Sequence, residues 1–120
     1  MRDMRYFILK DFECPDCHLA LMDDDFLFKL DFLRHQVGIP MWVNSGYRGE
    51  KHEKAVGGSG ANHPKGKAAD IRSSVRGLAG IVRYAPALGF TGMGMKLQGA
   101  LKSRYIHLDT THKVFTPWTY

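Results

Sequence analysis

The stretch DDDFLFKLDFLRHQVGIPMWV, residues 23–43, contains a helix signal followed at once by a strand signal. Three aspartates open it, and the helix dipole favours negative charge at that end. Gly38 is a suitable C-terminal cap, and Pro40 prevents the helix from continuing. Residues 41–43 then predict a short buried strand. The helix itself is predicted by apolar side chains at helical spacing, namely Phe26, Leu27, Leu30, Leu33 and Val37.

Further elements are predicted on both sides of this stretch. Residues 5–9, RYFIL, predict a short strand, and residues 49–62 carry four glycines and no periodicity, which is typical of a loop. Residues 67–72 predict another strand. A second helix begins after Ser73 or Ser74 and ends by Gly89, or earlier at Pro86. Its apolar face consists of Val75, Leu78, Ala79, Val82 and Ala85.

The C-terminal third predicts two more strands. FTGMGM, residues 90–95, alternates larger residues with glycine, as strands that pass close to another backbone can. Residues 105–109, YIHLD, predict a strand with Tyr105, His107 and Asp109 on one face. The order of elements indicates an α+β fold, in which helices flank a small, mostly antiparallel sheet. The length of 120 residues indicates one domain, residues 1–120.

The overall charge and hydrophobicity indicate which kinds of partner to expect. The net charge of +5 suits an anionic partner, but the basic residues are scattered rather than grouped, so we expect no nucleic-acid binding. No apolar run approaches the roughly 20 residues that span a bilayer. The N-terminal apolar patch is too short for a signal peptide. We therefore expect no membrane span, and a chain that either stays where it is made or leaves by a route that needs no signal, such as release by lysis, carriage in a virion or an unusual export route. We also expect a monomer.

Cys14 and Cys17 in ECPDCH leave several interpretations open. A CxxC pair can be half of a zinc site, a redox pair or part of a plain turn. The sequence contains no second cysteine pair, and His18 would supply only a third ligand. We favour a structural turn, with a disulfide or a metal site as the alternatives.

A metal site is a stronger hypothesis elsewhere in the chain. His63 and Asp70 are seven residues apart across NHPKGKAAD, and a turn at Gly66 would let them converge. His107 would have to come from a neighbouring strand. Two imidazoles and one carboxylate suit zinc and leave a fourth position for water, which is the catalytic arrangement. The alternative is that these are ordinary surface, cap or turn residues.

Three motifs appear in a fixed order: VNSGYR, then NHPKGKAADI, then YIHLD, with GFTGMGM before the last. This ordered set resembles the zinc D-Ala-D-Ala carboxypeptidase and endopeptidase family, peptidase family M15. It is most similar to the short single-domain members of bacteria and phages, which share a fold with the hedgehog signalling domain. The resemblance covers roughly residues 26–120.

The resemblance implies a set of site residues. It makes His63, Asp70 and His107 the zinc ligands, and it places Tyr47 and Arg48 at the substrate. Arg48 would orient an anionic peptide or the polarised carbonyl. Many relatives have an acid or a histidine two or three residues before the last ligand, where this chain has Arg104 and Tyr105. Asp109 is therefore expected to be either the general base or a partner that orients a ligand.

The resemblance also implies an activity, namely zinc-dependent hydrolysis of a peptide bond in the stem peptide of bacterial peptidoglycan. Such an enzyme would be of the carboxypeptidase or the endopeptidase type, as in a phage endolysin. A non-catalytic zinc-containing binding module on the same fold is the alternative. A nucleic-acid-binding domain is a third and weaker hypothesis.

Overall fold

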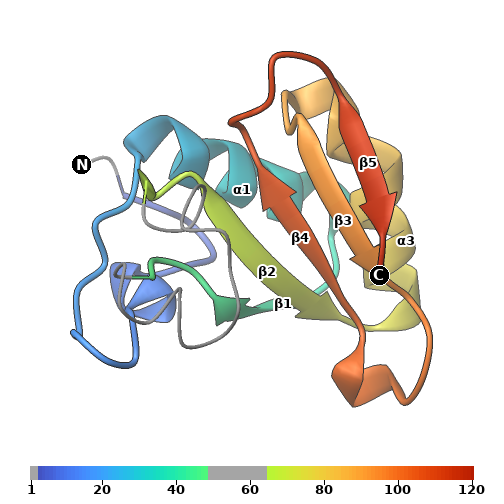
Figure 1. Ribbon diagram of the computed structural model, residues 1–120, viewed down its shortest axis with the longest axis horizontal. Coiled ribbons are helices and arrows are strands. Elements are labelled where there is room, and N and C mark those ends of the chain that lie inside the picture. Colours follow the sequence, from blue (N-terminus) through green and yellow to red (C-terminus); the bar gives the residue numbers. More distant parts are fainter. Residues whose placement is uncertain (1–2, 49–64) are drawn as a thin grey trace.

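The computed structural model describes residues 3–48 and 65–120. The predicted loop at 49–62 and the predicted ligand His63 therefore lie outside the described residues. Two α-helices and five strands make up the described fold (Figure 1). In chain order these are α1 (Asp24–Val37), β1 (Met41–Ser45), β2 (Ala68–Ser73), α3 (Val75–Tyr84), β3 (Gly92–Lys96), β4 (Tyr105–Asp109) and β5 (Thr116–Thr119). Short 3-10 helices are η1 (Leu9–Phe12), η3 (Pro86–Leu88) and η4 (Leu101–Ser103).

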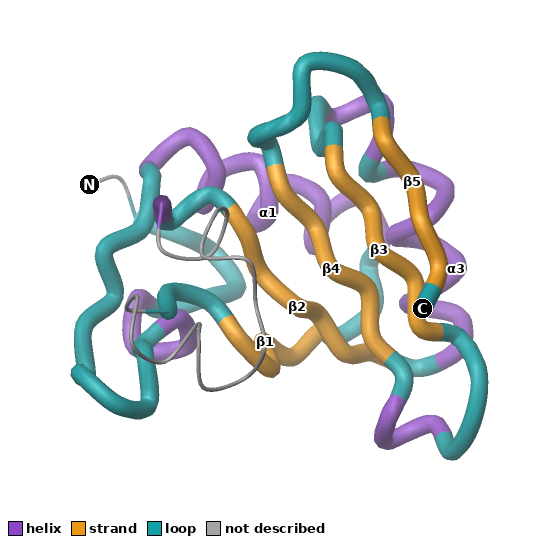
Figure 2. Tube along the Cα trace, in the orientation of Figure 1, coloured by secondary structure: helices purple, strands orange, loops and turns teal. Residues whose placement is uncertain are grey.

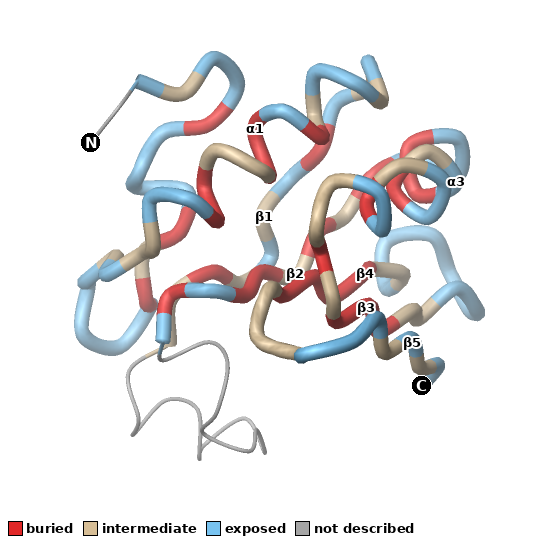
Figure 3. Tube along the Cα trace, turned by 90° about the horizontal axis from the view of Figure 1, so that it is seen from above, coloured by how far each residue is buried: buried red, intermediate tan, exposed pale blue. Residues whose placement is uncertain are grey.

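The five strands form one sheet in the order β1-β2-β4-β3-β5. All neighbouring pairs are antiparallel except β3 and β5, which run parallel. Both α-helices lie on the same side of this sheet (Figure 3). The predicted α+β class with a small, mostly antiparallel sheet is confirmed. No helix among the described residues is long and apolar enough to cross a membrane.

The hydrophobic core lies between the sheet and the two helices. Because successive side chains of a strand point to opposite faces, every second strand residue contributes to it. The buried residues that form this core include Phe26, Leu30, Ile71, Leu78, Ile81, Met93, Ile106 and Leu108. The intervening strand residues, Asp70, Gly94 and His107 among them, therefore face away from the helices. No helix of the described residues covers this second face, which we call the open face, and it carries polar side chains such as Asp70 and His107 (Figure 3).

Both predicted helices form, and their caps explain where they begin. The Asp23 side chain accepts a hydrogen bond from the backbone N–H of Phe26, and α1 ends at Gly38 with a φ of 72°. Ser74, rather than Ser73, caps α3 by accepting from the N–H of Gly77. The α3 helix stops at Tyr84, and Pro86 begins a 3-10 turn, as its fixed φ and missing N–H predict.

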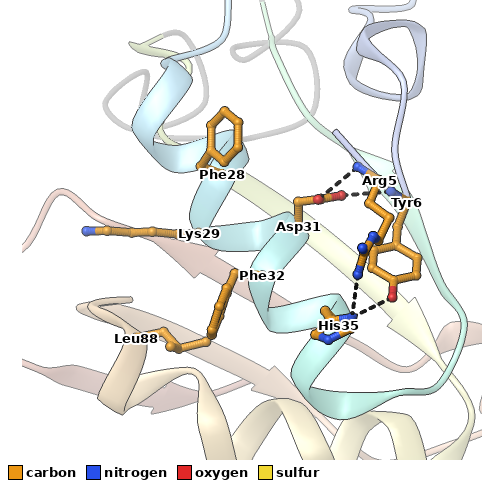
Figure 4. Close-up of a pocket in the computed structure, with 8 residues that line it drawn as sticks. All are labelled: Arg5, Tyr6, Phe28, Lys29, Asp31, Phe32, His35 and Leu88. Carbon is orange, nitrogen blue, oxygen red and sulfur yellow. Dashed lines mark hydrogen bonds between the residues drawn. The ribbon is translucent and has the colours of Figure 1, made fainter. Parts of the chain in front are cut away.

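The predicted strand at residues 5–9 is wrong. The backbone N–H groups of Arg5 and Tyr6 donate to the two carboxylate oxygens of Asp31, at 2.9 and 2.8 Å, so these donors are not available to a sheet (Figure 4). The segment is loop that leads into η1, as Figure 2 shows. Asp31 is buried, so it fastens the N-terminal segment to α1 through charge-assisted hydrogen bonds.

The strand β5 was not predicted from the sequence. It is short, contains Pro117 and lies at the edge of the sheet beside β3, where a residue without an N–H is tolerated. Its residues alternate between partly buried and exposed positions, so they lack the apolar signal of an inner strand. The consequence is that Trp118 is brought opposite Gly94 on β3.

The cysteine motif forms a turn, as favoured from the sequence. The N–H of His18 donates to the carbonyl of Cys14 at 2.8 Å, and His18 has a positive φ of 56°. Cys14 is buried while Cys17 is exposed, and no disulfide joins them in this structure. The disulfide alternative therefore does not describe this structure.

Candidate metal and catalytic site

The register of the sheet brings Asp70 and His107 together. Asp70 on β2 is directly opposite His107 on β4, and His107 is directly opposite Gly94 on β3. Directly opposite residues of an antiparallel pair share a face. Because their neighbours Ile71, Ile106 and Leu108 fill the core, Asp70 and His107 lie on the open face. Two residues that are 37 positions apart in the chain thus become cross-strand neighbours.

The imidazole of His107 is held by carboxylates at both of its nitrogens. Nδ1 is 3.0 Å from Oδ1 of Asp70, and Nε2 is 2.8 Å from Oδ2 of Asp109. His107 is buried, and burial by itself lowers its pKa. The hydrogen bonds with Asp109 and Asp70 outweigh burial and raise the pKa of His107 to about 9. The metal-free site therefore stabilises a protonated imidazole.

Asp109 is fully buried and uses both of its carboxylate oxygens. Oδ2 faces His107, while Oδ1 accepts from the N–H and the hydroxyl of Thr111 at 3.1 and 3.0 Å. His112 Nδ1 also lies 2.8 Å from Oδ1. Burial raises the pKa of Asp109, but hydrogen bonds from His107, Thr111 and His112 outweigh burial and lower it to about 2. Such a carboxylate is a poor proton acceptor, and it is well placed to orient the His107 ring.

Arg48 reaches the site because the strand β1 is irregular near its end. The register shifts between Val43 and Ser45, so that Ser45 is opposite Asp70. A bulge of this kind re-aims the following side chain. The Ser45 hydroxyl then accepts from Arg48 Nε at 2.8 Å, and Arg48 Nη2 donates to Oδ2 of Asp70 at 2.8 Å. Arg48 thus holds the outer oxygen of Asp70, while Oδ1 of the same carboxylate faces His107.

Glycines on β3 make room for the side chains around His107. A Cβ at Gly92 would overlap the Asp109 carboxylate, and a Cβ at Gly94 would overlap the indole of Trp118. Trp118 covers the site, with ring centroids 5.3 Å from His107 and 5.9 Å from His112. The prediction that GFTGMGM allows a close approach is therefore refined, since neighbouring side chains occupy the space.

The remaining predicted residues are placed as follows. Gly66 has a φ of 72°, so a turn does precede β2. The backbone N–H of Tyr47 donates to the carbonyl of Phe12 at 2.8 Å, which joins the segment after β1 to the end of η1. His63 is outside the described residues. A hollow of about 240 Å³ opens beside Arg48 and Ser45, with Asp11, Glu13 and Asn44 in its wall.

The donor atoms of Asp70 and His107 fit a zinc ion. Their 3.0 Å separation is close to the spacing on the order of 3.4 Å between neighbouring ligands of a tetrahedral zinc ion. The other nitrogen of His107 is occupied by a carboxylate, which is the usual support for a zinc-bound imidazole. Among the described residues, no group of three His, Cys, Asp or Glu side chains could hold a metal ion. A third ligand is therefore needed to complete such a site, and the predicted ligand His63 lies outside the described residues.

Three contributors to this site were not predicted from the sequence. Ser45 depends on the irregularity in β1, His112 on the turn after β4, and Trp118 on the unpredicted strand β5. The position of Ser45 within VNSGYR and the spacing of His112 three residues after Asp109 are signals in the sequence. Trp118 offered no comparable signal, because it lies beyond the last motif.

Comparison with protein families identifies a match. The family model described as Peptidase M15 matches residues 16–109, which include Arg48, Asp70, His107 and Asp109. A search of curated proteins finds no match.

Proposed function

The chain belongs to the M15 peptidase family, and on that premise we propose that it is a zinc-dependent peptidase that cuts a peptide bond in bacterial peptidoglycan. One observation carries the proposal. Asp70 and His107 point their donor atoms at each other on the open face of the sheet, while Asp109 holds the far nitrogen of the imidazole. This arrangement supports a metal site rather than a pair of ordinary strand residues.

The proposed zinc ligands are His63, Asp70 and His107. Nδ1 of His107 and Oδ1 of Asp70 face each other at 3.0 Å and are the atoms that would hold the ion. Asp109 contacts the other nitrogen of His107, and Arg48 donates to the other oxygen of Asp70. When bound, zinc supplies a Lewis acid that polarises a peptide carbonyl and lowers the pKa of a water molecule.

Arg48 has a double role in this proposal. Its guanidinium fixes the orientation of Asp70 through a 2.8 Å hydrogen bond, and it brings a permanent positive charge to the site. A charge in this position would stabilise the negative charge that develops on the carbonyl oxygen. The neighbouring Tyr47 would line the approach of the substrate.

Asp109 is proposed as a positioning residue rather than the general base. It is fully buried, both oxygens accept hydrogen bonds, and its pKa is lowered to about 2. A base must reach the water that it deprotonates and bind the proton near neutral pH. Asp109 instead fixes the ring of His107 and leaves Nδ1 facing the proposed metal.

The proposal is tested by measuring bound zinc and cleavage of isolated cell walls by the purified protein. We expect about one zinc per chain and release of peptide fragments. His63→Ala and His107→Ala should lose both. His35→Gln is the matched control, because His35 lies on α1 and bonds to Tyr6 at 2.7 Å, away from the open face. Full wall cleavage by His63→Ala would refute the proposal.

Bound zinc without release of any wall fragment would favour the alternative of a zinc-containing binding module on the same fold.

A further inference from the structure

A groove of about 510 Å³ lies beside the candidate site, lined by Trp42, Arg72, Ser73, Ser74, Leu101 and Lys102. Trp42 on β1 is directly opposite Arg72 on β2. Both side chains lie on the open face, because their neighbours Met41 and Ile71 belong to the core. Arg72 is two residues from Asp70, about 7 Å along the strand. The groove therefore continues the surface that carries Asp70 and His107.

The groove is positively charged. Arg72 and Lys102 contribute two cations, and within residues 3–48 and 65–120 no Asp or Glu forms an ion pair with either of them. The Arg72 guanidinium lies over the indole of Trp42, 5.9 Å from the ring centroid. Stacking of this kind holds the guanidinium above the sheet without using its hydrogen-bond donors.

The groove also presents exposed apolar side chains. Trp42 retains 53% of its surface and Leu101 retains 43%. An exposed indole on a strand, next to two cations, combines an apolar platform with charge. Extended chains that carry carboxylates match both features, since the backbone and aliphatic parts pack on the ring and the carboxylates meet the cations.

We propose that this groove is a substrate subsite that binds a carboxylate-bearing segment of the peptide next to the bond that is cut. Arg72 and Lys102 bind the carboxylate, and Trp42 packs against the adjoining part of the chain. The inference rests on the proposed function, because it takes the open face as the place where the peptide lies. It adds a determinant of specificity that is separate from the metal ligands.

The test measures binding directly, in the metal-free protein, so that it does not depend on catalysis. An acidic tetrapeptide is titrated while the indole N–H signals of the two tryptophans are followed by NMR. A second titration uses the same peptide with its carboxylates converted to amides. We expect the acidic peptide to shift the Trp42 signal and the amidated peptide to bind at least fivefold more weakly.

Variants assign the effect to the groove. Arg72→Gln should weaken binding of the acidic peptide by about twofold to fivefold, as expected for one exposed charge contact. Trp42→Ala should weaken binding of both peptides. The matched controls are Arg83→Gln, whose guanidinium is 5.2 Å from the Tyr84 ring on α3, and Phe32→Ala, an exposed aromatic on α1. Neither control should change binding.

Two outcomes separate this inference from the proposed function. Binding that is insensitive both to Arg72→Gln and to amidation would overturn the subsite. Binding that follows the pattern above, in a protein that cleaves no wall peptide when loaded with zinc, would support the subsite and refute the proposed activity.

Discussion

Asp109 fixes the imidazole of His107 through Nε2, and its removal should affect both stability and metal binding. Asp109→Ala leaves a buried imidazole nitrogen without its partner, which costs about 3–5 kcal/mol when a buried pair is broken. Loss of such a support also lowers metal affinity about 10–100-fold. Urea unfolding of the metal-free protein and zinc competition with a chelator would measure the two effects. Asp3→Asn, at an exposed position, is the control. An unchanged zinc affinity in Asp109→Ala would contradict the positioning role.

His112 should have a smaller effect of the same kind. It is partly exposed and contacts Oδ1 of Asp109 at 2.8 Å, one step further from the proposed metal. We expect His112→Ala to lower zinc affinity several-fold, because the carboxylate loses one of the groups that fix it. His112→Asn, which can still donate to the carboxylate, should recover part of the loss. Equal affinities of Ala and Asn variants would mean that the hydrogen bond is not the cause.

At the level of single residues, the sequence revealed the parts of the site that follow strand periodicity. The alternation in YIHLD placed Tyr105, His107 and Asp109 on one face, and the structure has them there. Ser45, His112 and Trp118 could not be found in this way. Their positions depend on a shift of register, a turn and an edge strand, which arise from contacts between segments that are distant in the sequence.

Among the elements, the turn before β2 is the one on which the site depends most. Gly66 has a φ of 72°, and its carbonyl accepts from the N–H of Asp23 at 2.9 Å, which ties the start of β2 to the start of α1. Gly38 has the same φ but has no atoms within 4 Å of an added Cβ. At Gly66 an added Cβ would overlap the carbonyl of Leu21. Alanine substitutions at the two glycines can therefore be compared. At Gly38 the substitution costs backbone strain alone, and at Gly66 it costs the same strain plus steric overlap.

We expect Gly38→Ala to lower the free energy of unfolding by about 1–2 kcal/mol, the usual cost of a left-handed conformation for a residue with a Cβ. Gly66→Ala should cost more than this, because the backbone of residues 21–23 must also move. Chemical denaturation of both variants would measure the difference. Equal losses would show that the chain around Leu21 yields freely.

Helices were easier to predict than the sheet edges because their signals are local. Asp23 and Ser74 cap the helices through contacts within three residues, and the apolar spacing gives the buried face. Residues 5–9 have the composition of a strand, but Asp31 takes the N–H groups of Arg5 and Tyr6. The strand β5 forms by pairing with β3. Its sequence TPWT lacks the apolar alternation from which a strand can be predicted locally.

At the scale of the whole molecule, the sheet places the hydrophobic core and the candidate site on opposite faces. One face is covered by α1 and α3 and holds the core (Figure 3). The other face carries Asp70, His107 and Arg72. The open face combines anionic groups at the proposed metal position with the cationic groove of Arg72 and Lys102. A substrate can therefore meet both regions without any change in the core.

The stability of the metal-free protein should depend on pH because His107 and Asp109 on the open face have shifted pKa values. The pKa of His107 is raised from 6.5 to about 9, so its contribution to stability is complete below pH 6.5 and is lost as the pH rises through 9. The pKa of Asp109 is lowered from 3.8 to about 2, so its contribution is complete above pH 3.8 and is lost as the pH falls through 2. Stability from this pair should therefore be greatest between about pH 4 and 6.5.

Urea unfolding of the metal-free protein at pH 6, 8 and 10 would measure the alkaline part of this dependence. We expect the free energy of unfolding to fall across this range, and the fall to be smaller in His107→Gln, which has no imidazole to lose a proton. Zinc should reduce the fall in the wild-type protein, since a metal ligand must be deprotonated and binding improves as the proton leaves. If the free energy of unfolding falls equally in the wild-type and His107→Gln proteins, other groups cause the alkaline loss of stability and His107 does not.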